Sequence, residues 1–322
     1  MTDEAYRGVR TLVLGGSGFI GAWTARMLHA KGAVVTAAAR NPWRVAEALG
    51  PAADHVSVAG ADLEQPAVVA NLIDATRPAV VFNLAGYGVD RSERSPGQML
   101  TMGPALVVAI CEALARSTSD GWTGMRLVHA GSGAEYGRLD GPVTAASPLL
   151  PVTDYGRAKL QATESLRTLS ASMGFRAVIA RLFTVFGPGE PSDRLLPTLM
   201  RTARTGIPLA LTNGGQRRDF TYIADVTEGL LRLGASGARA GEAVNLATGR
   251  LSSVRDFVEA AAAVLEIPAA CLQFGALPDR DDETWHGEVD VTRLRELTGW
   301  VPPTSLGEGV GRSRDWDQGQ LR

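Results

Sequence analysis

Tyr155 and Lys159 lie four residues apart, in a segment whose pattern predicts a helix from Tyr155 to Met173 that ends at Gly174. At this spacing two side chains share one face of a helix and can contact each other. A free tyrosine has a pKa near ~10, too high for ready proton exchange at neutral pH, and a neighbouring ammonium lowers that pKa by stabilising the phenolate. The pair is therefore suited to moving a proton to or from an oxygen that changes between carbonyl and alcohol.

Ser132 lies upstream of this helix and follows an apolar segment, residues 125–130, that predicts a strand. Its hydroxyl could share with Tyr155 the hydrogen bond to a substrate oxygen. Among 32 basic residues only Lys31 and Lys159 are lysines, which points to a task at 159 for a compact ammonium. We predict Ser132, Tyr155 and Lys159 as the catalytic residues.

A glycine-rich run, Gly15-Gly16-Ser17-Gly18-Phe19-Ile20-Gly21, lies between a predicted strand at residues 9–14 and a helical segment that stops at Gly32. A second predicted strand, residues 33–39, completes a βαβ unit. Glycines at this spacing allow a tight turn and a close approach to a pyrophosphate, and the start of the helix favours a phosphate. The predicted cofactor contacts in this run are Gly15, Ser17, Gly18, Phe19, Ile20 and Gly21.

The end of the second strand should meet the adenosine ribose of a bound dinucleotide. NAD sites usually place an acid there for the 2′-hydroxyl group, whereas NADP sites place a cation for the 2′-phosphate. The segment here is Ala39-Arg40-Asn41-Pro42-Trp43-Arg44, with two arginines and no acid. Arg40 is therefore a predicted cofactor residue, unless it is only solvated surface. NADP(H) is the preferred cofactor and NAD(H) is the other possibility.

Strand and helix patterns continue to alternate beyond this unit. Strands are predicted at residues 56–63, 79–86 and 125–130, with a helix at 106–115. Repeated βα units form a doubly wound parallel sheet whose ligands bind outside the carboxyl ends of the strands. Further cofactor contacts are therefore predicted at strand ends, namely Asp62, Leu63, Leu84, Ala85 and Gly86.

The order of these motifs resembles the extended short-chain dehydrogenase/reductase family, in its nucleotide-sugar epimerase/dehydratase group. The likeness is carried by the glycine run, Ser132, Tyr136-Gly137 and Tyr155-Gly156-Arg157-Ala158-Lys159. It continues through Arg181-Leu182-Phe183-Thr184-Val185-Phe186-Gly187-Pro188-Gly189, Arg217-Arg218-Asp219-Phe220-Thr221-Tyr222-Ile223-Ala224-Asp225-Val226 and Leu297-Thr298-Gly299-Trp300-Val301-Pro302. The resemblance therefore covers nearly the whole chain.

This resemblance implies roles for individual residues. The three predicted catalytic residues would act as a triad. Tyr155 and Lys159 would also contact the cofactor, and Lys159 would hold its nicotinamide ribose. Arg218 would grip the diphosphate of a nucleotide sugar, a task that suits a guanidinium fork, unless it forms an ion pair with Asp219 or Asp225. The predicted substrate-binding residues are Tyr87, Ser132, Glu135, Tyr136, Thr184 and Arg218.

Three departures from the family pattern bear on the reaction. The family often has Asn where Thr184 stands, and it usually has an active-site Asn where Thr101-Met102-Gly103 stands. The 4,6-dehydratases of the group follow their Ser or Thr with Asp-Glu, an acid/base pair that removes water. Gly133-Ala134 occupies those positions here, and Glu135 is one place late. Elimination of water is therefore disfavoured.

The pattern changes after Pro188. Helices are predicted at residues 195–204, 224–233, 254–266 and 291–298, and short strands at 209–211 and 242–246. The resemblance implies a Rossmann-type α/β fold with a smaller C-terminal substrate-binding lobe, whose cleft wall could include Tyr87, Tyr136, Trp285 and His286 unless these residues only pack. We expect a dinucleotide-binding domain at 1–185, joined by later segments near 216–247, and a mainly substrate-binding lobe at 186–322.

Composition argues against several classes of function. The net charge is −2 without a basic stripe, so no nucleic-acid partner is expected. No apolar run approaches the ~20 residues of a membrane span, and residues 1–10 lack the apolar core of a secretion signal. Cys111 and Cys271 are expected to be reduced structural thiols, and no metal site is predicted. We expect a cytoplasmic protein and, from the resemblance, a homodimer through the helices around 100–115 and 155–173.

Three functions fit these observations. The first is an NADP-dependent ketoreductase acting on a nucleotide-activated keto sugar, with Tyr155 as the acid. The second is a nucleotide-sugar 4-epimerase that retains its cofactor, usually NAD, and Arg40 weighs against it. The third is a cofactor-sensing protein without catalysis, against which the complete set of Ser132, Tyr155 and Lys159 argues.

Overall fold

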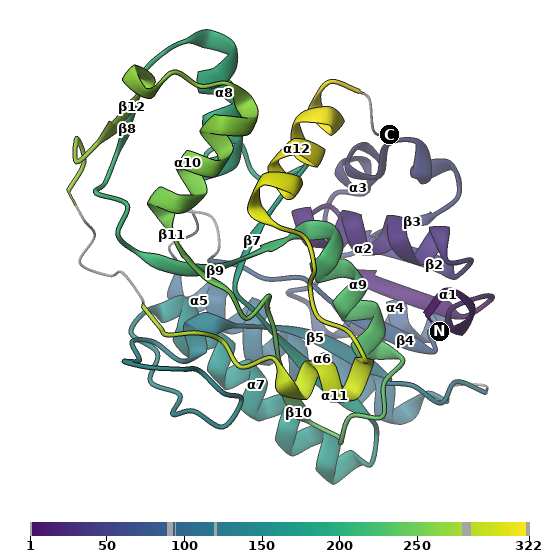
Figure 1. Ribbon diagram of the computed structural model, residues 1–322. Helices are drawn as coiled ribbons and strands as arrows, with labels where there is room; N and C mark the ends of the chain where they lie inside the picture. The colour runs from purple at the N-terminus through teal and green to yellow at the C-terminus, as the bar shows by residue number, and fades with distance from the viewer. Residues whose placement is uncertain (1, 89–92, 94, 119–120, 279–284, 320–322) are drawn as a thin grey trace.

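The computed structural model describes residues 2–88, 93, 95–118, 121–278 and 285–319. Within this part of the chain, the centre is a seven-stranded sheet whose neighbouring strands are all parallel (Figure 1). From edge to edge the strands are β10 (Glu242–Leu246), β6 (Ala177–Leu182), β5 (Leu127–Ser132), β4 (Val80–Asn83), β1 (Arg10–Leu14), β2 (Val34–Ala39) and β3 (Ser57–Gly60). The predicted doubly wound sheet is therefore confirmed, and the strand order reverses between β1 and β4, where such folds bind ligands.

Helices cover both faces of this sheet. On one face lie α2 (Phe19–Ala30), α3 (Pro42–Leu49) and α9 (Ile223–Gly234), and on the other lie α4 (Pro66–Thr76), α6 (Leu106–Arg116) and α7 (Asp154–Met173). Because both faces are buried, the central strands are apolar without alternation. In β1, Leu12 and Leu14 pack toward α4, α6 and α7, while Val13 packs toward α2 and α9.

A smaller lobe is built on a second sheet, in which β9 (Arg217–Tyr222) lies between β7 (Thr184–Phe186) and β11 (Leu251–Ser253). Figure 1 shows α8 (Leu195–Thr205), α10 (Val254–Leu265) and α12 (Leu306–Asp317) grouped around it, with the short pair β8 (Leu209–Leu211) and β12 (Leu272–Phe274) at the periphery. In its core Phe257 stacks on Phe220 and packs edge-on against Phe186, and this core is separate from the two cores of the large sheet.

The two parts interleave along the chain. After β9 the chain returns to the large sheet as α9 and β10, passes to the lobe as β11 and α10, and comes back as α11 (Thr292–Thr298) beside α9 and β10. The shorter helical segments are α1 (Thr2–Ala5), α5 (Pro96–Leu100), a π-helical turn (Thr101–Ala105) and the 3₁₀ helices Gly50–Asp54, Gly133–Glu135 and Ala269–Cys271.

Residues Pro96–Arg116 form one continuous helical stretch that is long and apolar enough, by length and composition, to cross a membrane. Half of its most apolar window is buried inside the protein, where α6 packs against α4 and α7. The expectation that no apolar run approaches the length of a span is thus corrected. Since the core helix of a globular protein passes the same test, this finding among the described residues is weak evidence for a membrane.

A buried ion pair ties the end of β5 to β6. The guanidinium Nε of Arg181 lies 2.9 Å from Oε2 of Glu135, and the two side chains are 1% and 0% exposed. The other oxygen of Glu135 accepts the backbone N–H of Ser132 at 2.8 Å. Arg181 also donates to the hydroxyl of Tyr136 at 3.0 Å, and that hydroxyl donates to Asn245 of β10 at 2.7 Å. The turn that carries Ser132 is therefore fixed to the sheet by a chain of buried polar contacts.

We predict that Glu135→Ala destabilises the protein by about 3–5 kcal/mol, because it leaves the buried guanidinium of Arg181 without a counter-charge. The free energy of unfolding, measured by urea denaturation, checks this. Glu259→Ala is the matched control, because Glu259 pairs with Arg255 at 3.8 Å on the surface and should contribute less than about 1 kcal/mol. Equal, small effects of the two substitutions would contradict the prediction.

Candidate active site

The glycine-rich run turns sharply between β1 and α2. Gly15 has a φ of +82°, and a Cβ atom built on it would lie 2.7 Å from the backbone nitrogen of Ala85. A Cβ atom on Gly21 would lie 2.1 Å from the carbonyl oxygen of Gly15. Side chains are therefore excluded at both positions. Their absence lets the loop lie against the end of β4 and lets the start of α2 pack closely on the loop. No side chain caps this start of α2, while Ser17 and Gly18 are exposed, so its amide groups fit the pyrophosphate of a dinucleotide.

The neighbouring strand ends bring the other predicted cofactor residues to the same edge of the sheet. Leu84 and Ala85 follow β4 beside the glycine loop, and the backbone nitrogen of Leu84 donates to Leu14 at 3.0 Å. Asp62 follows β3 and accepts the backbone N–H of Glu64 at 3.2 Å, so its carboxylate shapes the turn. Leu63 is 5% exposed, and its side chain belongs to the core.

Arg40 lies directly after β2, at the predicted place of the adenosine ribose. Its side chain is 69% exposed, and Nη1 lies 3.6 Å from Oε1 of Glu64, whose side chain is 31% exposed. An ion pair of this kind between exposed groups contributes little, so the guanidinium can turn toward a bound phosphate. The structure therefore also supplies a carboxylate, Glu64, next to the cation that the sequence pattern singled out.

Tyr155 and Lys159 lie on the first turns of α7, which begins where Thr153 accepts the backbone N–H of Gly156 at 3.0 Å. The ammonium of Lys159 is buried and donates to the carbonyl oxygen of Ala130 at 2.9 Å. Its nitrogen lies 5.8 Å from the centre of the Tyr155 ring, so the predicted pair does share one face of the helix.

Both side chains reach the loop that follows β4. A Cβ atom built on Gly86 would lie 3.5 Å from Nζ of Lys159, and one built on Gly88 would lie 3.2 Å from Cδ2 of Tyr155. The absence of side chains at both glycines therefore leaves the lysine and the tyrosine open to a ligand at this strand end.

Ser132 ends β5 and caps the 3₁₀ helix that follows, where its Oγ accepts the backbone N–H of Ala134 at 3.1 Å. The hydroxyl proton of Ser132 is then directed away from this acceptor bond and can be donated. The same turn packs under the start of α7, since a Cβ atom on Gly156 would lie 2.5 Å from the carbonyl oxygen of Ala134. The serine turn and the catalytic helix are thus in direct contact.

Two of the predicted substrate residues need correction. The side chains of Glu135 and Tyr136 are 0% and 1% exposed, and both are bound to Arg181 beneath the serine turn. A fully buried carboxylate that already has a guanidinium and a backbone N–H as partners is not available to a substrate. Their role is to hold Ser132, and the sequence indicated only that they lie next to it.

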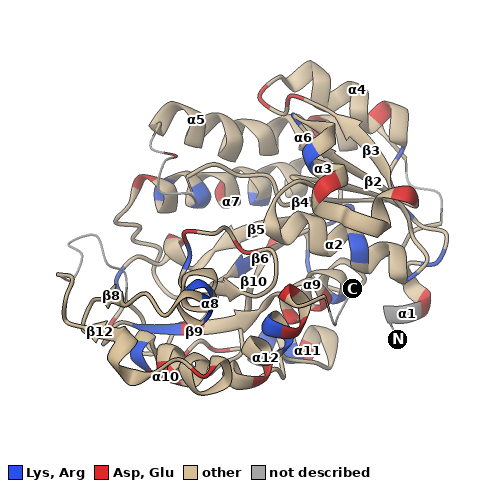
Figure 2. Cartoon of the chain, turned by 90° about the horizontal axis from the view of Figure 1, so that it is seen from above, with Lys and Arg blue, Asp and Glu red and all other residues tan. Residues whose placement is uncertain are grey.

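The remaining predicted substrate residues are less buried. Tyr87 and Thr184 are half-buried, and the hydroxyl of Tyr87 accepts the backbone N–H of Ser95 at 3.5 Å. Arg218 is half-buried on β9, whose basic start is blue in Figure 2, and its Nη1 donates to the carbonyl oxygen of Arg217 at 2.8 Å. The buried carboxylate of Asp219 accepts hydrogen bonds from Thr221, Thr248 and Gly249.

A hollow of about 400 Å³ lies beside this strand, between the segment after the serine turn and Trp285, His286 and Gly287. Trp285 stacks on the guanidinium of Arg138 at 4.6 Å and donates to Asp140 at 3.1 Å. His286 packs edge-on against Phe183, and burial together with the charge of Arg218 lowers its pKa. Trp285 and His286 therefore form a wall next to Arg217, as well as packing.

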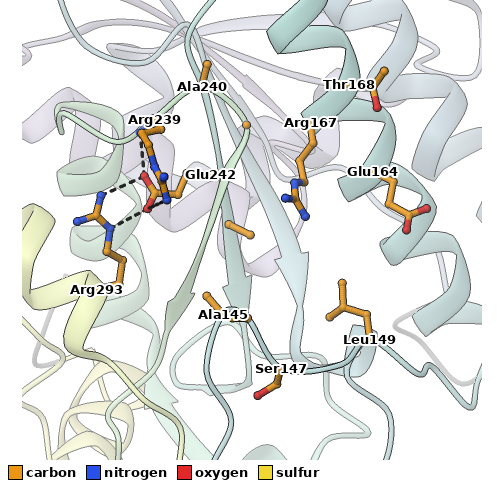
Figure 3. Close-up of a pocket in the computed structure, with 13 residues that line it drawn as sticks. Ala145, Ser147, Leu149, Glu164, Arg167, Thr168, Arg239, Ala240, Glu242 and Arg293 are labelled. Carbon is orange, nitrogen blue, oxygen red and sulfur yellow. Dashed lines mark hydrogen bonds and ion pairs between the residues drawn. The ribbon is translucent and has the colours of Figure 1, made fainter.

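Figure 3 shows a much larger hollow, of about 1220 Å³, whose lining includes neither the glycine loop nor the predicted catalytic residues. It runs along the outside of β10, between α7 and α11, and none of its lining residues is a predicted site residue. Arg239 and Arg293 point into it, but both form ion pairs with Glu242, whose side chain is 8% exposed. A choice of site by the volume of a hollow alone would therefore have led away from the predicted site residues.

Sequence reasoning missed a group of buried polar residues beneath Lys159. Asn83 ends β4 and lies beside His129 of β5, with 3.0 Å between Nδ2 of the amide and Nδ1 of the ring. Burial, and secondarily the charge of Lys159, lower the pKa of His129 to about 3. Two polar residues within otherwise apolar strands were the signal that could have identified them.

We predict that His129 makes the protein less stable as the pH falls from about 6.5 toward about 3. Over that range the imidazole binds a proton in the unfolded chain but stays neutral in the folded protein. Above that range the imidazole is neutral in both states and the effect is absent. Urea unfolding at about pH 7.5 and about pH 5.5 should show a smaller loss of stability in His129→Gln than in the wild type. His55→Gln, at an exposed position, is the control, and an unchanged loss in His129→Gln would contradict the prediction.

Comparison with known proteins agrees with this geometry. The family model described as "NAD dependent epimerase/dehydratase family" matches residues 11–247. A curated relative from Kitasatospora kifunensis, "dTDP-6-deoxy-L-talose 4-dehydrogenase (NAD(P)(+))", is 32% identical over 322 residues, which is 96% of each chain. The "UDP-glucose 4-epimerase" of Azospirillum brasilense is 28% identical over 345 residues, covering 99% of this chain and 94% of that protein.

Among solved structures, "MoeE5 in complex with UDP-glucuronic acid and NAD" superposes with a TM-score of 0.82 and 26% identity, covering 97% of this chain and 99% of that chain. The family match spans most of the chain, and the Kitasatospora relative covers nearly all of it. This protein therefore belongs to the NAD-dependent epimerase/dehydratase family and is an NAD(P)-dependent nucleotide-sugar-modifying enzyme of the extended short-chain dehydrogenase/reductase type.

Proposed function

We propose that this enzyme is an NADP-dependent ketoreductase that reduces a keto group of a nucleotide-activated deoxysugar to an alcohol. One observation carries the proposal: Glu135, the acid nearest to Ser132, is buried in an ion pair with Arg181. Gly133 and Ala134 add no acid of their own, so the site has a proton donor but lacks the acid pair that eliminates water. The 32% identical relative named as a 4-dehydrogenase supports the same assignment, because dehydrogenation and keto reduction are one step in opposite directions.

In the proposed reaction Tyr155, Ser132 and Lys159 each have a separate role. NADPH, when bound at the glycine loop, supplies the hydride. The hydroxyl of Tyr155 gives its proton to the carbonyl oxygen, while the hydroxyl of Ser132 donates a second hydrogen bond to that oxygen. The ammonium of Lys159, fixed by Ala130 at 2.9 Å, stabilises the phenolate that remains on the tyrosine.

A nucleotide diphosphate is the substrate handle that suits the lobe. Arg218 offers a guanidinium fork on β9. The hollow beside β9 is lined by its neighbour Arg217 and walled by Trp285 and His286. Thr184 starts the neighbouring strand β7, parallel to β9, so it lies at the same level as Phe220. We assign the diphosphate to Arg218, and we assign Tyr87 and Thr184 to the sugar side of the cleft.

Arg40 supports NADPH as the coenzyme that is consumed. Its exposed guanidinium lies after β2, and its ion pair with Glu64 at 3.6 Å is easily exchanged for a 2′-phosphate. Glu64 can instead bind the 2′-hydroxyl group of NAD if Arg40 turns to solvent, so NAD(H) is the second coenzyme in this proposal.

We predict that Arg40→Asp weakens NADPH binding by roughly 10- to 100-fold, because a charge-assisted contact to the 2′-phosphate is lost. The affinity for NADH should change much less, and titration of the reduced cofactor's fluorescence measures both. Arg116→Asp, at an exposed position at the end of α6, is the control. Equal losses for NADPH and NADH in Arg40→Asp would remove its assigned role.

We further predict that the purified enzyme oxidises added NADPH when given a nucleoside-diphospho-4-keto-6-deoxyhexose and forms the corresponding alcohol. Tyr155→Phe should lower kcat by about 10²- to 10⁴-fold, since the proton donor is removed, with little change in cofactor affinity. Full activity of Tyr155→Phe would show that the acid is misassigned.

The assay also separates the reductase from the 4-epimerase, for which the relative from Azospirillum is the supporting comparison. An epimerase would hold its dinucleotide through purification and interconvert two 4-epimers without added NADPH. That outcome would replace the reductase proposal with the epimerase.

We also infer a cytoplasmic homodimer. The stretch Pro96–Arg116 is apolar but only half buried in its most apolar window, and Leu100 is 46% exposed. A second copy that covers this stretch and the adjacent α7 would remove its apolar surface from water. Light scattering of the purified protein distinguishes a dimer from a monomer.

A further inference from the structure

Three buried polar side chains lie beneath the catalytic lysine and are not used by the proposed reaction. Asn83, His129 and Thr163 are 1%, 2% and 0% exposed. One atom of each, namely Oδ1 of Asn83, Nε2 of His129 and Oγ1 of Thr163, is buried without a hydrogen-bond partner among the described residues. Buried polar atoms are almost always satisfied by protein or by ordered water, so three together call for an occupant.

The three residues share one face of the sheet. Asn83 and His129 are paired in register on β4 and β5. Val81 and Leu127 lie two residues before them and pack toward α6 and α7, so alternation places Asn83 and His129 on that same face. Thr163 lies on α7, four residues after Lys159 and therefore on the same side of the helix.

The hydrogen bond between Asn83 and His129 fixes the ring proton. Nδ2 of the amide is a donor, so Nδ1 of the ring, 3.0 Å away, must accept. A neutral imidazole carries one proton, which is therefore on Nε2. The cluster thus contains an unpaired donor, Nε2–H, an unpaired acceptor, Oδ1 of Asn83, and the unpaired hydroxyl of Thr163, which can donate or accept.

We propose that His129 and Thr163 hold an ordered water beneath Lys159 and that they are positioning residues for its ammonium. That water would accept from Nε2–H and bond Oγ1 of Thr163. The amide of Asn83 lies on the Nδ1 side of the ring, so its part is to hold the imidazole with Nε2–H turned toward the water. The remaining lone pair of that water accepts an N–H of Lys159, which has three donors and gives one to Ala130. With two donors so directed, the third points to the open side at Gly86.

The consequence for the reaction follows from geometry. A lysine held at one point can swing about that bond, whereas one held at two points keeps its third N–H aimed at the ligand. This step rests on the proposed function of Lys159. The water itself does not, so it can be tested without turnover.

The first test is a crystal structure of the wild-type protein and of Thr163→Val. Ordered density within hydrogen-bond distance of both Nε2 of His129 and Oγ1 of Thr163 in the wild type supports the water, and an empty space there overturns the proposal. Thr163→Val should also lower the thermal midpoint by about 2 °C or more, because a satisfied hydroxyl is lost. A neutral or raised midpoint would show that the hydroxyl had no partner to lose.

The second test is kinetic, in the NADPH-dependent reduction. Thr163→Val and His129→Phe should lower kcat about tenfold with KM for the sugar unchanged, and Thr163→Ser, which keeps the hydroxyl, should restore it. Thr227→Val is the control, because Thr227 is a fully buried threonine of α9, on the other face of the sheet, whose hydroxyl bonds Ile223. If the control lowers kcat as much, or if Thr163→Ser fails to restore it, the positioning role is wrong. A wild type that reduces no keto sugar would refute the proposed function alone and leave the crystal and thermal tests to decide the water.

Discussion

Two cations are buried at the carboxyl ends of the central strands, and the protein treats them differently. Arg181 donates hydrogen bonds to a carboxylate, a tyrosine hydroxyl and a carbonyl oxygen, so its charge is neutralised inside the fold. In the part of the chain that the structure describes, Lys159 donates a hydrogen bond to the carbonyl oxygen of Ala130 and lies near a neutral histidine, His129. Because no carboxylate neutralises the lysine there, its charge remains available to a phenolate and to a bound cofactor.

The cost of burying these charges explains the organisation around them. A guanidinium inside a sheet is tolerated only with a paired carboxylate, and this pairing brings Glu135 inward and fixes the backbone of Ser132. The predicted catalytic serine is therefore positioned by a structural ion pair, while the ammonium of Lys159 is bound by the neutral carbonyl group of Ala130. The glycine loop adds a steric constraint, since it leaves no room for a side chain at Gly15 between β1 and the residues after β4.

Much of the fold was predictable because its signals are local. Glycines at φ above zero, helix caps such as Thr153 and apolar runs gave the βα units and most of the lobe's helices. The burial of the Glu135 and Tyr136 side chains was not predictable, since proximity to Ser132 in the chain says nothing about which way a side chain points. The same holds for α12, whose twelve residues Leu306–Asp317 carry many charges and three glycines, and which is stabilised by packing on the lobe.

The site was predictable where the chemistry needs a fixed spacing, and was not where it depends on contacts across the fold. Tyr155 and Lys159 are set by one helical turn, so sequence suffices. Asn83, His129 and Thr163 come from two strands and a helix that are distant in the sequence, and only their pairing makes them a group. Glu64, beside Arg40, was missed for the same reason, because it follows a different strand.

The position of Glu135 within its turn determines what its carboxylate contacts. In a 3₁₀ helix successive residues project about 120° apart, so an acid at 134 would leave the turn in a different direction from one at 135. At 135 the carboxylate reaches Arg181 and the backbone N–H of Ser132, both behind the turn. An acid one residue earlier would leave the turn in another direction. The carboxylate of Glu135 instead holds the serine turn, and this is the observation on which the reductase proposal rests.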